Sequence, residues 1–346
     1  MSSMDKYFLG IDIGTSSVKL VMANKSGDVK KARSKYNFNN PEGWCEALKN
    51  ALNVLKGQIP LSLISAIALS SQVGTYITDQ GDVIEWSSSC GEKELVEIKT
   101  AVSDDEFIKE IGMVHPNLIS YPLPRLLYIK RNCKNATSVL MPKEVIINEL
   151  TGNKITDTFS QRGICNPLNN RYSERLLSRF NIDLKLPEIK NPTDIAGFIT
   201  EKASNIYGLP LDVPVFVGCN DFYAGLLGMG VLEYDTVFEL SGTSEHIGII
   251  TSELEKGSNI SSKFFNGYVT YGGTKASGIS CDFAIKNFGI GELDENLKIT
   301  NQPIFLPYLK GERAPIYNEN AKGVFFGISA NTTKQDMAYA ASGGVE

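Results

Sequence analysis

The stretch IDIGTSSVK at residues 11–19 predicts a strand, a tight turn and a second strand, and the stretch ELSGTSE at residues 239–245 repeats its pattern. Each is an apolar run that breaks at a Gly-Thr-Ser turn and is followed by a second apolar run (residues 20–23 and 247–250). This pattern is typical of a β-hairpin. A turn of glycine and small hydroxyl residues lets a phosphate approach the backbone N–H groups closely. Two such turns in one chain predict two phosphate-binding turns that face one nucleotide across a cleft.

The composition is that of an ordinary globular protein and excludes some classes of partner. The chain has 346 residues, which favours two domains. Apolar residues make up 42% and charged residues 21%, with a net charge of −5. Nucleic acids and anionic membranes usually bind basic patches, so we expect no nucleic-acid partner. No apolar run is long enough to span a membrane, and we expect no membrane partner.

Cysteine and histidine usage favours a reducing compartment and argues against histidine catalysis. The six cysteines form no C-x-x-C pair, which leaves no zinc or redox motif. The N-terminus lacks the apolar segment of a signal peptide, so we expect free thiols and a cytoplasmic protein. The two histidines, His115 and His246, are interpreted as structural or surface residues.

The order of apolar runs predicts alternating strands and helices, which is typical of the α/β class. The two similar hairpins favour an internal duplication. Residues 232–235 are interpreted as a hinge, so we expect an N-terminal domain at residues 1–235 and a C-terminal domain at residues 236–346. Expected strands are residues 7–12, 18–24, 29–36, 63–70, 75–78 and 213–217, and expected helices are residues 44–56, 104–111, 123–131, 142–151, 173–180, 203–207 and 225–231.

Asp12 is the first candidate for chemistry, because it ends an apolar strand two residues before the first turn. Mg²⁺ on nucleotide phosphates needs an oxygen ligand of this kind, often through water. The alternative is an aspartate that caps its own turn. Lys19 follows on the return strand, where it could offset phosphate charge or simply be a solvated surface lysine.

Asp221 is the second candidate, just after the apolar strand at residues 213–217. Ligands of open α/β sheets bind at the carboxyl ends of the strands. A segment of small residues, 224–228, follows at once, so the carboxylate is expected near a helix N-terminus. There it could accept a proton from an attacking hydroxyl group. The alternative is an aspartate that only caps the helix.

Three further turns lie in the second half of the chain. SGTS at residues 241–244 is either a plain hairpin turn or a phosphate contact, and its pairing with the first turn favours the contact. GGTKASG at residues 272–278 could approach a nucleotide closely or be a flexible loop. In GERAP, residues 311–315, the structural interpretation of Arg313 as an ion-pairing residue is favoured over an active-site role.

Together these segments resemble the FGGY family of carbohydrate kinases, which contains xylulokinase, glycerol kinase and gluconate kinase. The resemblance runs from Tyr7 to the last residue, and the order and spacing of the motifs carry it. It implies two ribonuclease H-like domains of the actin-like architecture, which close over a central cleft. The matching segments are GIDIGT (10–15), LPEI (186–189) through GLP (208–210), PV (214–215), GCND (218–221), SGTS (241–244), GERAP (311–315) and Gly323.

The resemblance also implies roles for single residues in the transfer of the γ-phosphate of ATP to a sugar hydroxyl. Asp221 would be the general base, and Asn220 would line the sugar pocket. Asp12 would hold Mg²⁺ through water, and closure of the domains would expel water from the site. The implied nucleotide contacts are Gly14, Thr15, Ser16, Ser17 and Lys19 in the first turn, Gly242 and Thr243 in the second, and Gly278.

The sugar-side motifs depart from the family pattern. Many members read G-Q-M-H-G where this chain reads SQVGT at residues 71–75, so only Gln72 is carried over as a substrate contact. The family motif W-x-D-x-R matches Trp86, but Ser88 and Cys90 replace its aspartate and arginine. We therefore expect an unusual acceptor or a degraded pocket.

The chain also ends earlier than is usual in the family. It stops where the helix before the adenosine-binding segment begins, so the resemblance implies an incomplete second domain without the glycine-rich loop that holds adenine. Such a domain should expose apolar surface.

The sequence thus predicts a cytoplasmic kinase that uses ATP and Mg²⁺ and acts on a small sugar, polyol or sugar acid. A xylulose-like substrate is the best single choice, and a homodimer is left open. Two other classes stay open: an inactive sugar- or nucleotide-binding member of the family, and an actin-like ATPase. The matches at residues 218–221 and 311–315 argue against the actin-like class.

Overall fold

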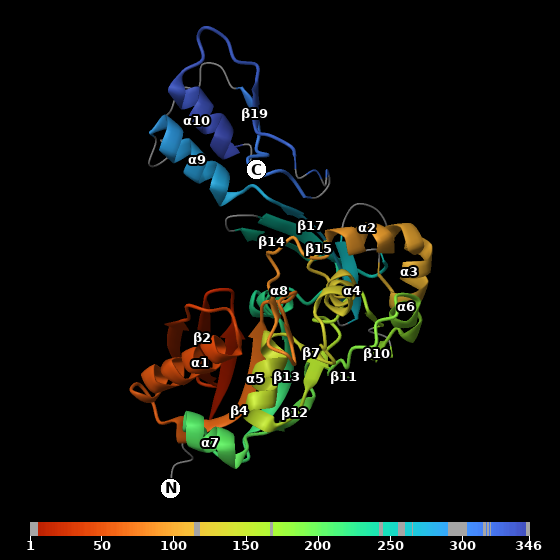
Figure 1. Cartoon of the computed structure of the whole chain (residues 1–346). Coiled ribbons are helices and arrows are strands. Elements are labelled where there is room, and N and C mark those ends of the chain that lie inside the picture. The colour runs from red at the N-terminus through yellow and green to blue at the C-terminus, as the bar shows by residue number, and fades with distance from the viewer. Residues whose placement is uncertain are drawn as a thin grey trace. The chain divides into compact units, whose positions relative to one another are not determined.

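The computed structural model describes residues 6–113, 118–166, 169–241, 245–254, 260–264, 266–289, 303–313, 316, 318 and 320–343. The chain divides into two compact units, residues 1–230 and 231–346, which Figure 1 colours from red to green and from green to blue. Helices and strands follow one another along the chain, which confirms the α/β class. Among the described residues, no helix is both long and apolar enough to cross a membrane.

The first unit is built on a six-stranded sheet with the strand order β12-β13-β4-β1-β2-β3. β1 pairs antiparallel with β2 and parallel with β4, and β4 pairs parallel with β13. The carboxyl ends of β1, β4 and β13 therefore lie at one edge of the sheet. The six strands are β1 (Tyr7–Ile13), β2 (Ser17–Asn24), β3 (Val29–Lys35), β4 (Ile64–Ser71), β12 (Ile195–Phe198) and β13 (Pro214–Asn220).

Helices and three small sheets complete the first unit. The helices are α1 (Pro41–Lys56), α2 (Glu92–Ala101), α3 (Asp104–Ile111), α4 (Pro122–Asn132), α5 (Pro142–Thr151), α6 (Glu174–Arg179), α7 (Glu201–Tyr207) and α8 (Asp221–Gly228), with a 3₁₀ turn at Leu61–Leu63. The small sheets pair β5 (Tyr76–Thr78) with β6 (Val83–Ile84) and β7 (Val139–Leu140), β8 (Ile155–Asp157) with β11 (Glu188–Lys190), and β9 (Cys165–Asn166) with β10 (Arg171–Tyr172).

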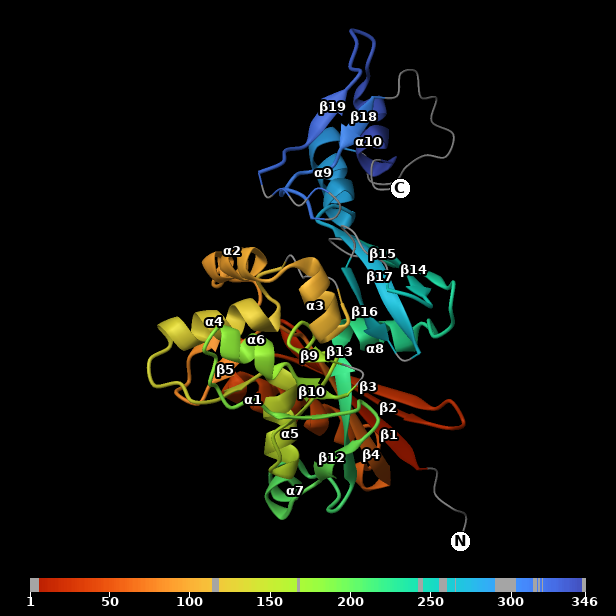
Figure 2. The same cartoon turned by 90° about the vertical axis from the view of Figure 1, so that its right-hand side faces the viewer.

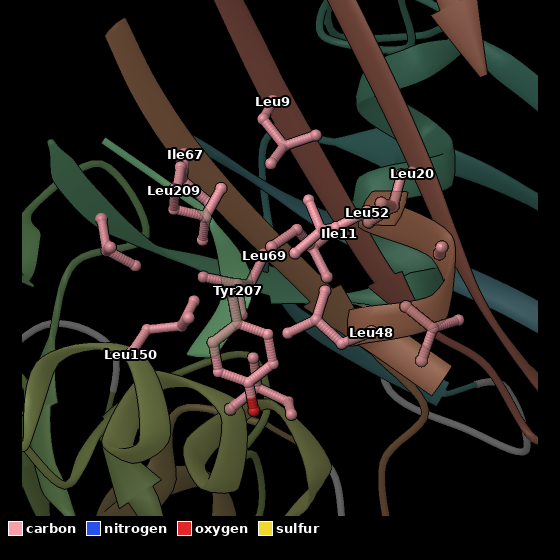
Figure 3. Close-up of a cluster of buried hydrophobic side chains, with 14 of the residues drawn as sticks. Leu9, Ile11, Leu20, Leu48, Leu52, Ile67, Leu69, Leu150, Tyr207 and Leu209 are labelled. Atoms are coloured by element: carbon pink, nitrogen blue, oxygen red, sulfur yellow. The ribbon is translucent and has the colours of Figure 1, made fainter. Parts of the chain in front are cut away.

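The core of the first unit lies between one face of the six-stranded sheet and helices α1, α5 and α7. Side chains alternate between the two faces of β1, so Leu9, Ile11 and Ile13 are buried while Asp12 lies on the opposite face. Figure 3 shows this cluster, to which the strands contribute Leu9, Ile11, Leu20, Ile67 and Leu69 and the helices contribute Leu48, Leu52, Leu150 and Tyr207. Burial of one face of β1 thus directs Asp12 away from the core.

The second unit contains an antiparallel sheet with the order β14-β15-β17-β16, and Figure 2 shows β14, β15 and β17 side by side. Ala284 of α9, Phe305 of β18 and Ala338 of α10 form a separate small core. The elements are β14 (Val237–Ser241), β15 (Glu245–Thr251), β16 (Ile260–Phe264), β17 (Gly267–Thr274), α9 (Gly278–Phe288), β18 (Ile304–Leu306), β19 (Val324–Phe326) and α10 (Lys334–Gly343).

Both predicted hairpins are present, and one predicted helix is misplaced. β1 pairs with β2 and β14 pairs with β15, each antiparallel. The helix predicted at residues 225–231 is instead α8, which begins at Asp221 and ends at Gly228. It begins early because the Asn220 side chain caps it. Helix α2 was not predicted, and its low apolar content explains why periodicity missed it.

Lys143 of α5 and Asp157 of β8 form a fully buried ion pair. Asp157 also accepts hydrogen bonds from the Ser160 N–H at 2.9 Å and the Ser160 hydroxyl at 2.6 Å. Lys143 Nζ lies 3.4 Å from the carbonyl oxygen of Gly218, close to the end of β13. The pair therefore joins α5, β8 and β13 at the edge of the sheet that carries Asp221.

Replacing Lys143 with Met should lower the free energy of unfolding by about 3 to 5 kcal/mol, because the buried Asp157 carboxylate loses its cation. The matched control is Lys130→Met. Lys130 pairs with Asp183 at 2.5 Å on the surface, and exposed pairs contribute about 0 to 1 kcal/mol. Urea unfolding of both variants measures the difference. Equal stability of the two variants would contradict the claim that the buried Lys143 charge stabilises the fold by pairing with Asp157.

Candidate active site

A row of polar side chains crosses three strands on the face of the sheet opposite the core. Asp12 of β1 is in register with Lys19 of β2 and with Ser70 of β4. Lys19 Nζ lies 3.2 Å from Asp12 Oδ2, and the Ser70 hydroxyl donates to Asp12 Oδ1 at 2.7 Å. The Asp12 side chain is 28% exposed and the Lys19 side chain 53%. The register thus holds the Asp12 carboxylate between a cation and a hydroxyl donor, within reach of solvent.

The first Gly-Thr-Ser turn presents two exposed hydroxyl residues. The Gly14 N–H donates to the Ser17 carbonyl oxygen at 3.0 Å, which closes the turn. Thr15 and Ser16 are exposed at its tip. Ser17 is buried in β2, and its hydroxyl accepts a hydrogen bond from Arg33 Nε at 3.0 Å. The expectation that Ser17 faces a phosphate does not match this placement, whereas Thr15 and Ser16 are accessible to one.

Gln72 is buried directly after β4 and links two loops. Its Nε2 donates to Asn39 Oδ1 at 2.8 Å and to the Gly14 carbonyl oxygen at 3.4 Å. The Thr75 hydroxyl donates to Gln72 Oε1 at 3.4 Å and accepts the Trp86 N–H at 3.1 Å. The sequence predicted Gln72 as a substrate contact. Its buried amide instead positions the first turn relative to the Trp86 loop.

Arg125 of α4 shapes the loop in which Ser88 and Cys90 replace the family's aspartate and arginine. Its buried guanidinium donates to the carbonyl oxygens of Trp86 at 2.9 Å, Ser88 at 3.0 Å and Cys90 at 2.5 Å. It also donates to the Ser88 hydroxyl at 2.8 Å. Burial lowers the pKa of Arg125. No local sequence pattern indicates this contact, because Arg125 lies 35 residues from Cys90.

Strand β13 ends in a bulge that only glycine can form. Gly218 has a φ of +68°, and the register with β4 shifts between Phe216 and Cys219. A Cβ atom on Gly218 would lie 1.8 Å from the carbonyl oxygen of Leu69. The bulge therefore requires a residue without a side chain, and it sets the direction in which the chain leaves the sheet toward Asp221.

Asn220 holds the turn from β13 into α8. It is fully buried, and its Oδ1 accepts the Tyr223 N–H at 3.0 Å as the N-cap of α8. Its Nδ2 donates to the Phe159 carbonyl oxygen at 3.1 Å. The prediction that Asn220 lines the sugar pocket does not match this placement, because both ends of its amide are used inside the protein. Asp221 follows as the first residue of α8 and is not the cap.

The surroundings of Asp221 shift the pKa of its carboxyl group. Burial raises the pKa of Asp221 above its usual value, and the Asp12 carboxylate raises it further. The Phe222 N–H, which donates to Asp221 Oδ1 at 2.8 Å, and the Arg162 guanidinium oppose the rise. Protein atoms thus desolvate the carboxylate although the residue is still exposed to solvent. An accessible carboxylate with a raised pKa is suited to accept a proton.

The second unit, described by itself, contains a hairpin, a helix N-terminus and a buried glutamate among the predicted segments. Gly242 and Thr243 lie outside the described residues. Gly278 is the first residue of α9, where backbone N–H groups can bind an anion. Glu312 of the GERAP segment is buried, and its Oε1 accepts the Lys275 N–H at 2.8 Å. Glu312 thereby fixes the glycine-rich loop before α9, a role that the sequence did not indicate.

The residues around Asp12 fit a magnesium ion that arrives with a nucleotide. Among the described residues, no three His, Cys, Asp or Glu side chains gather as metal ligands. Mg²⁺ usually keeps several waters and takes one or two carboxylates together with substrate phosphates. Asp12, near the carboxyl end of β1, and Asp221, directly after β13, lie at one edge of the sheet and offer carboxylates of this kind.

Similar proteins are known as sugar and sugar-acid kinases. The xylulose kinase of Staphylococcus xylosus is 28% identical over 98% of this chain and 77% of its own length. The gluconokinase of Bacillus subtilis is 27% identical over 99% of this chain and 75% of its own length. The ligand-bound xylulose kinase structure from Lactobacillus acidophilus is 25% identical, with a TM-score of 0.86, and matches 98% of this chain and 76% of its own.

Family models match both units. The N-terminal domain model of the FGGY family of carbohydrate kinases matches residues 7–228, and the C-terminal domain model matches residues 241–345. The fold of this family has two ribonuclease H-like, actin-like domains, in agreement with the resemblance noted from the motifs. The chain therefore belongs to the FGGY family of carbohydrate kinases.

Proposed function

We propose that this kinase transfers the γ-phosphoryl group of ATP to a hydroxyl group of a small sugar, polyol or sugar acid, with Asp221 as general base. The observation that carries the proposal is the pair of carboxylates at one edge of the sheet. Asp221 begins α8 with a raised pKa and is accessible to solvent, and Asp12 lies beside the first phosphate-type turn. Phosphoryl transfer depends mainly on positioning and electrostatic stabilisation, which this arrangement offers.

The other candidate residues are assigned to phosphate binding, to metal binding or to support of the loops. We propose that Asp12 holds Mg²⁺ through water and that Thr15, Ser16 and Lys19 bind the β- and γ-phosphates. Bound Mg²⁺ would neutralise charge on the phosphates. In residues 231–346 we propose nucleotide contacts at Gly278 and Thr243. For Ser17, Gln72 and Asn220 we propose a supporting role in these loops, which their burial favours.

The acceptor is proposed to be a xylulose-like ketose or a gluconate-like sugar acid. Both classes are suggested by relatives of similar identity, 28% for the Staphylococcus xylosus xylulose kinase and 27% for the Bacillus subtilis gluconokinase. A coupled ADP-release assay over pentuloses, hexuloses, polyols and aldonates tests the proposal. We expect ADP release that depends on one acceptor class. A folded chain that binds ATP but shows no acceptor-stimulated release would contradict the kinase assignment.

Replacing Ser70 with Ala should raise the Mg²⁺ concentration needed for half-maximal activity by about 10-fold. The hydroxyl donates to Asp12 Oδ1, and loss of a partner that orients a metal-binding carboxylate typically weakens metal affinity by 10- to 100-fold. The matched control is Ser65→Ala, which removes the hydroxyl bonded to the Tyr7 carbonyl oxygen at the opposite end of β4. A Mg²⁺ titration at saturating ATP and acceptor measures both variants. An unchanged Mg²⁺ requirement in Ser70→Ala would contradict the proposal that Ser70 orients the Asp12 carboxylate for the metal.

A further inference from the structure

The loop between β8 and β9 carries Arg162 and is fastened to the turn that presents Asp221. At its start, Ser160 bonds to the buried Asp157 through both its N–H and its hydroxyl. The Phe159 carbonyl oxygen accepts a hydrogen bond from Asn220, the residue before Asp221. The loop and the catalytic turn are therefore parts of one hydrogen-bonded structure, and the position of Arg162 relative to Asp221 is set by the fold.

Two tyrosine rings hold the Arg162 guanidinium. Its central carbon lies 4.8 Å from the centre of the Tyr121 ring and 5.9 Å from the centre of the Tyr223 ring. Tyr223 is fully buried in the first turn of α8, two residues after Asp221, and stacks on Phe159 with ring centres 4.5 Å apart. Cation–π contacts of this kind attract a guanidinium to the face of an aromatic ring. Arg162 is thus a fixed positive charge beside the candidate base.

The chemistry of a guanidinium held between aromatic rings favours a planar anion as its ligand. Contact with the rings occupies a different region of the side chain from its five N–H donors, which lie in the plane of the guanidinium. That fork of donors matches the two oxygens of a carboxylate. A lysine at the same place would offer a point charge without this geometry.

The position of Arg162 assigns it to the acceptor rather than to the phosphates of ATP. The candidate phosphate residues Thr15, Ser16 and Lys19 belong to the hairpin of β1 and β2. Arg162 instead contacts α8, which follows β13, and β4 separates β13 from β1 in the sheet. The acceptor hydroxyl must lie against Asp221, so the rest of a small acceptor is within reach of residues that pack on the start of α8.

We propose that Arg162 is a specificity-determining residue that binds a carboxylate of the acceptor, so that the site prefers a sugar acid to the neutral sugar alcohol of the same chain length. This inference rests on the proposed kinase function. It narrows the acceptor to a polyhydroxy monocarboxylate that is phosphorylated on one of its hydroxyl groups, with ATP giving ADP and the hydroxyl proton passing to Asp221.

Two matched pairs of acceptors, gluconate with glucitol and xylonate with xylitol, test the proposal. Carbon 1 is a carboxylate in each acid and a neutral hydroxymethyl group in each alcohol. We expect the native chain to have a higher kcat/KM for at least one acid than for its alcohol. In Arg162→Gln the acid-to-alcohol ratio of kcat/KM should fall about 10- to 100-fold, the usual contribution of a charge-assisted hydrogen bond. Arg162→Lys should retain part of the preference. The control Arg175→Gln changes an exposed arginine of the same unit, paired with Glu106, and should keep the native ratio.

Binding of the same four acceptors, measured by calorimetry on the native chain and on Arg162→Gln, gives a readout that does not need turnover. Arg162→Gln could have the same acid-to-alcohol ratio of kcat/KM as the native chain, with kcat/KM lower for both acceptors. That result would overturn the proposal and give Arg162 a structural role. A native preference for both alcohols would also overturn it. No phosphorylation of any acceptor, xylulose included, would count against the kinase function, and the binding preference would still decide the role of Arg162.

Discussion

Replacing Asp221 with Asn should lower kcat by about 10²- to 10⁴-fold, the usual contribution of a positioned general base. The KM for the acceptor should change little, because the amide has the same shape and still accepts the Phe222 N–H. The base must be ionised to act, so native activity should fall as the pH drops through the raised pKa of Asp221. That acidic limb of the pH profile should disappear in the variant.

The control for this result lies at the other end of the same strand. Asp212 is exposed two residues before β13, and its φ of +59° suits asparagine as well as aspartate. Asp212→Asn should therefore keep native kcat and stability. Steady-state kinetics on both variants, with circular dichroism to confirm folding, makes the comparison. Retained kcat in Asp221→Asn would remove Asp221 from the catalytic role.

Replacing Gly218 with Ala should destabilise the first unit by more than about 4 kcal/mol, among the largest effects of a single substitution. The new methyl group would lie 1.8 Å from the Leu69 carbonyl oxygen in the neighbouring strand β4. Neither backbone can move without breaking the ladder between β4 and β13. Because typical domains are stable by only about 5 to 15 kcal/mol, we expect a low yield of folded protein.

The variant Gly208→Ala is the control that separates the effect of the steric clash at Gly218 from the effect of its left-handed backbone conformation. Gly208 has the same φ of +68° as Gly218, but no atom lies within 4 Å of the position that its Cβ would take. Its substitution should cost only about 1 to 2 kcal/mol, the penalty of a left-handed conformation. Urea unfolding and limited proteolysis of both variants measure the difference. Similar stability of the two variants would contradict the account of the β13 bulge.

The sequence predicts the parts of the fold that local patterns encode. Alternating apolar residues in β1, followed by a Gly-Thr-Ser turn, identify the first hairpin and place Asp12 at its end. The apolar run of β13 likewise predicts that Asp221 follows a buried strand. Both depend on the spacing of neighbouring residues, which is visible in one sequence. The boundary of α8 was missed because its capping residue, Asn220, is also the last residue of β13.

Contacts between distant residues could not be predicted in this way. Arg125 bonds to a loop 35 to 39 residues away, and Lys143 pairs with Asp157 across two elements. Arg162 contacts the rings of Tyr121 and Tyr223, and Tyr223 lies two residues after Asp221. No local pattern links the segments that carry Tyr121, Arg162 and Tyr223. Buried polar partners of this kind are set by the fold, so local motifs identify the candidate carboxylates but not the residues that position them.

The identity of the phosphorylated product decides whether Asp221 helps to transfer the γ-phosphoryl group of ATP to an acceptor hydroxyl group. Phosphorus NMR of the chain with ATP, Mg²⁺ and the preferred acceptor should show a phosphate monoester of that acceptor forming in step with ADP. The same mixture with Asp221→Asn should form the ester about 10²- to 10⁴-fold more slowly. Inorganic phosphate as the main product, at a rate that the acceptor and the Asp221 substitution do not change, would contradict the account.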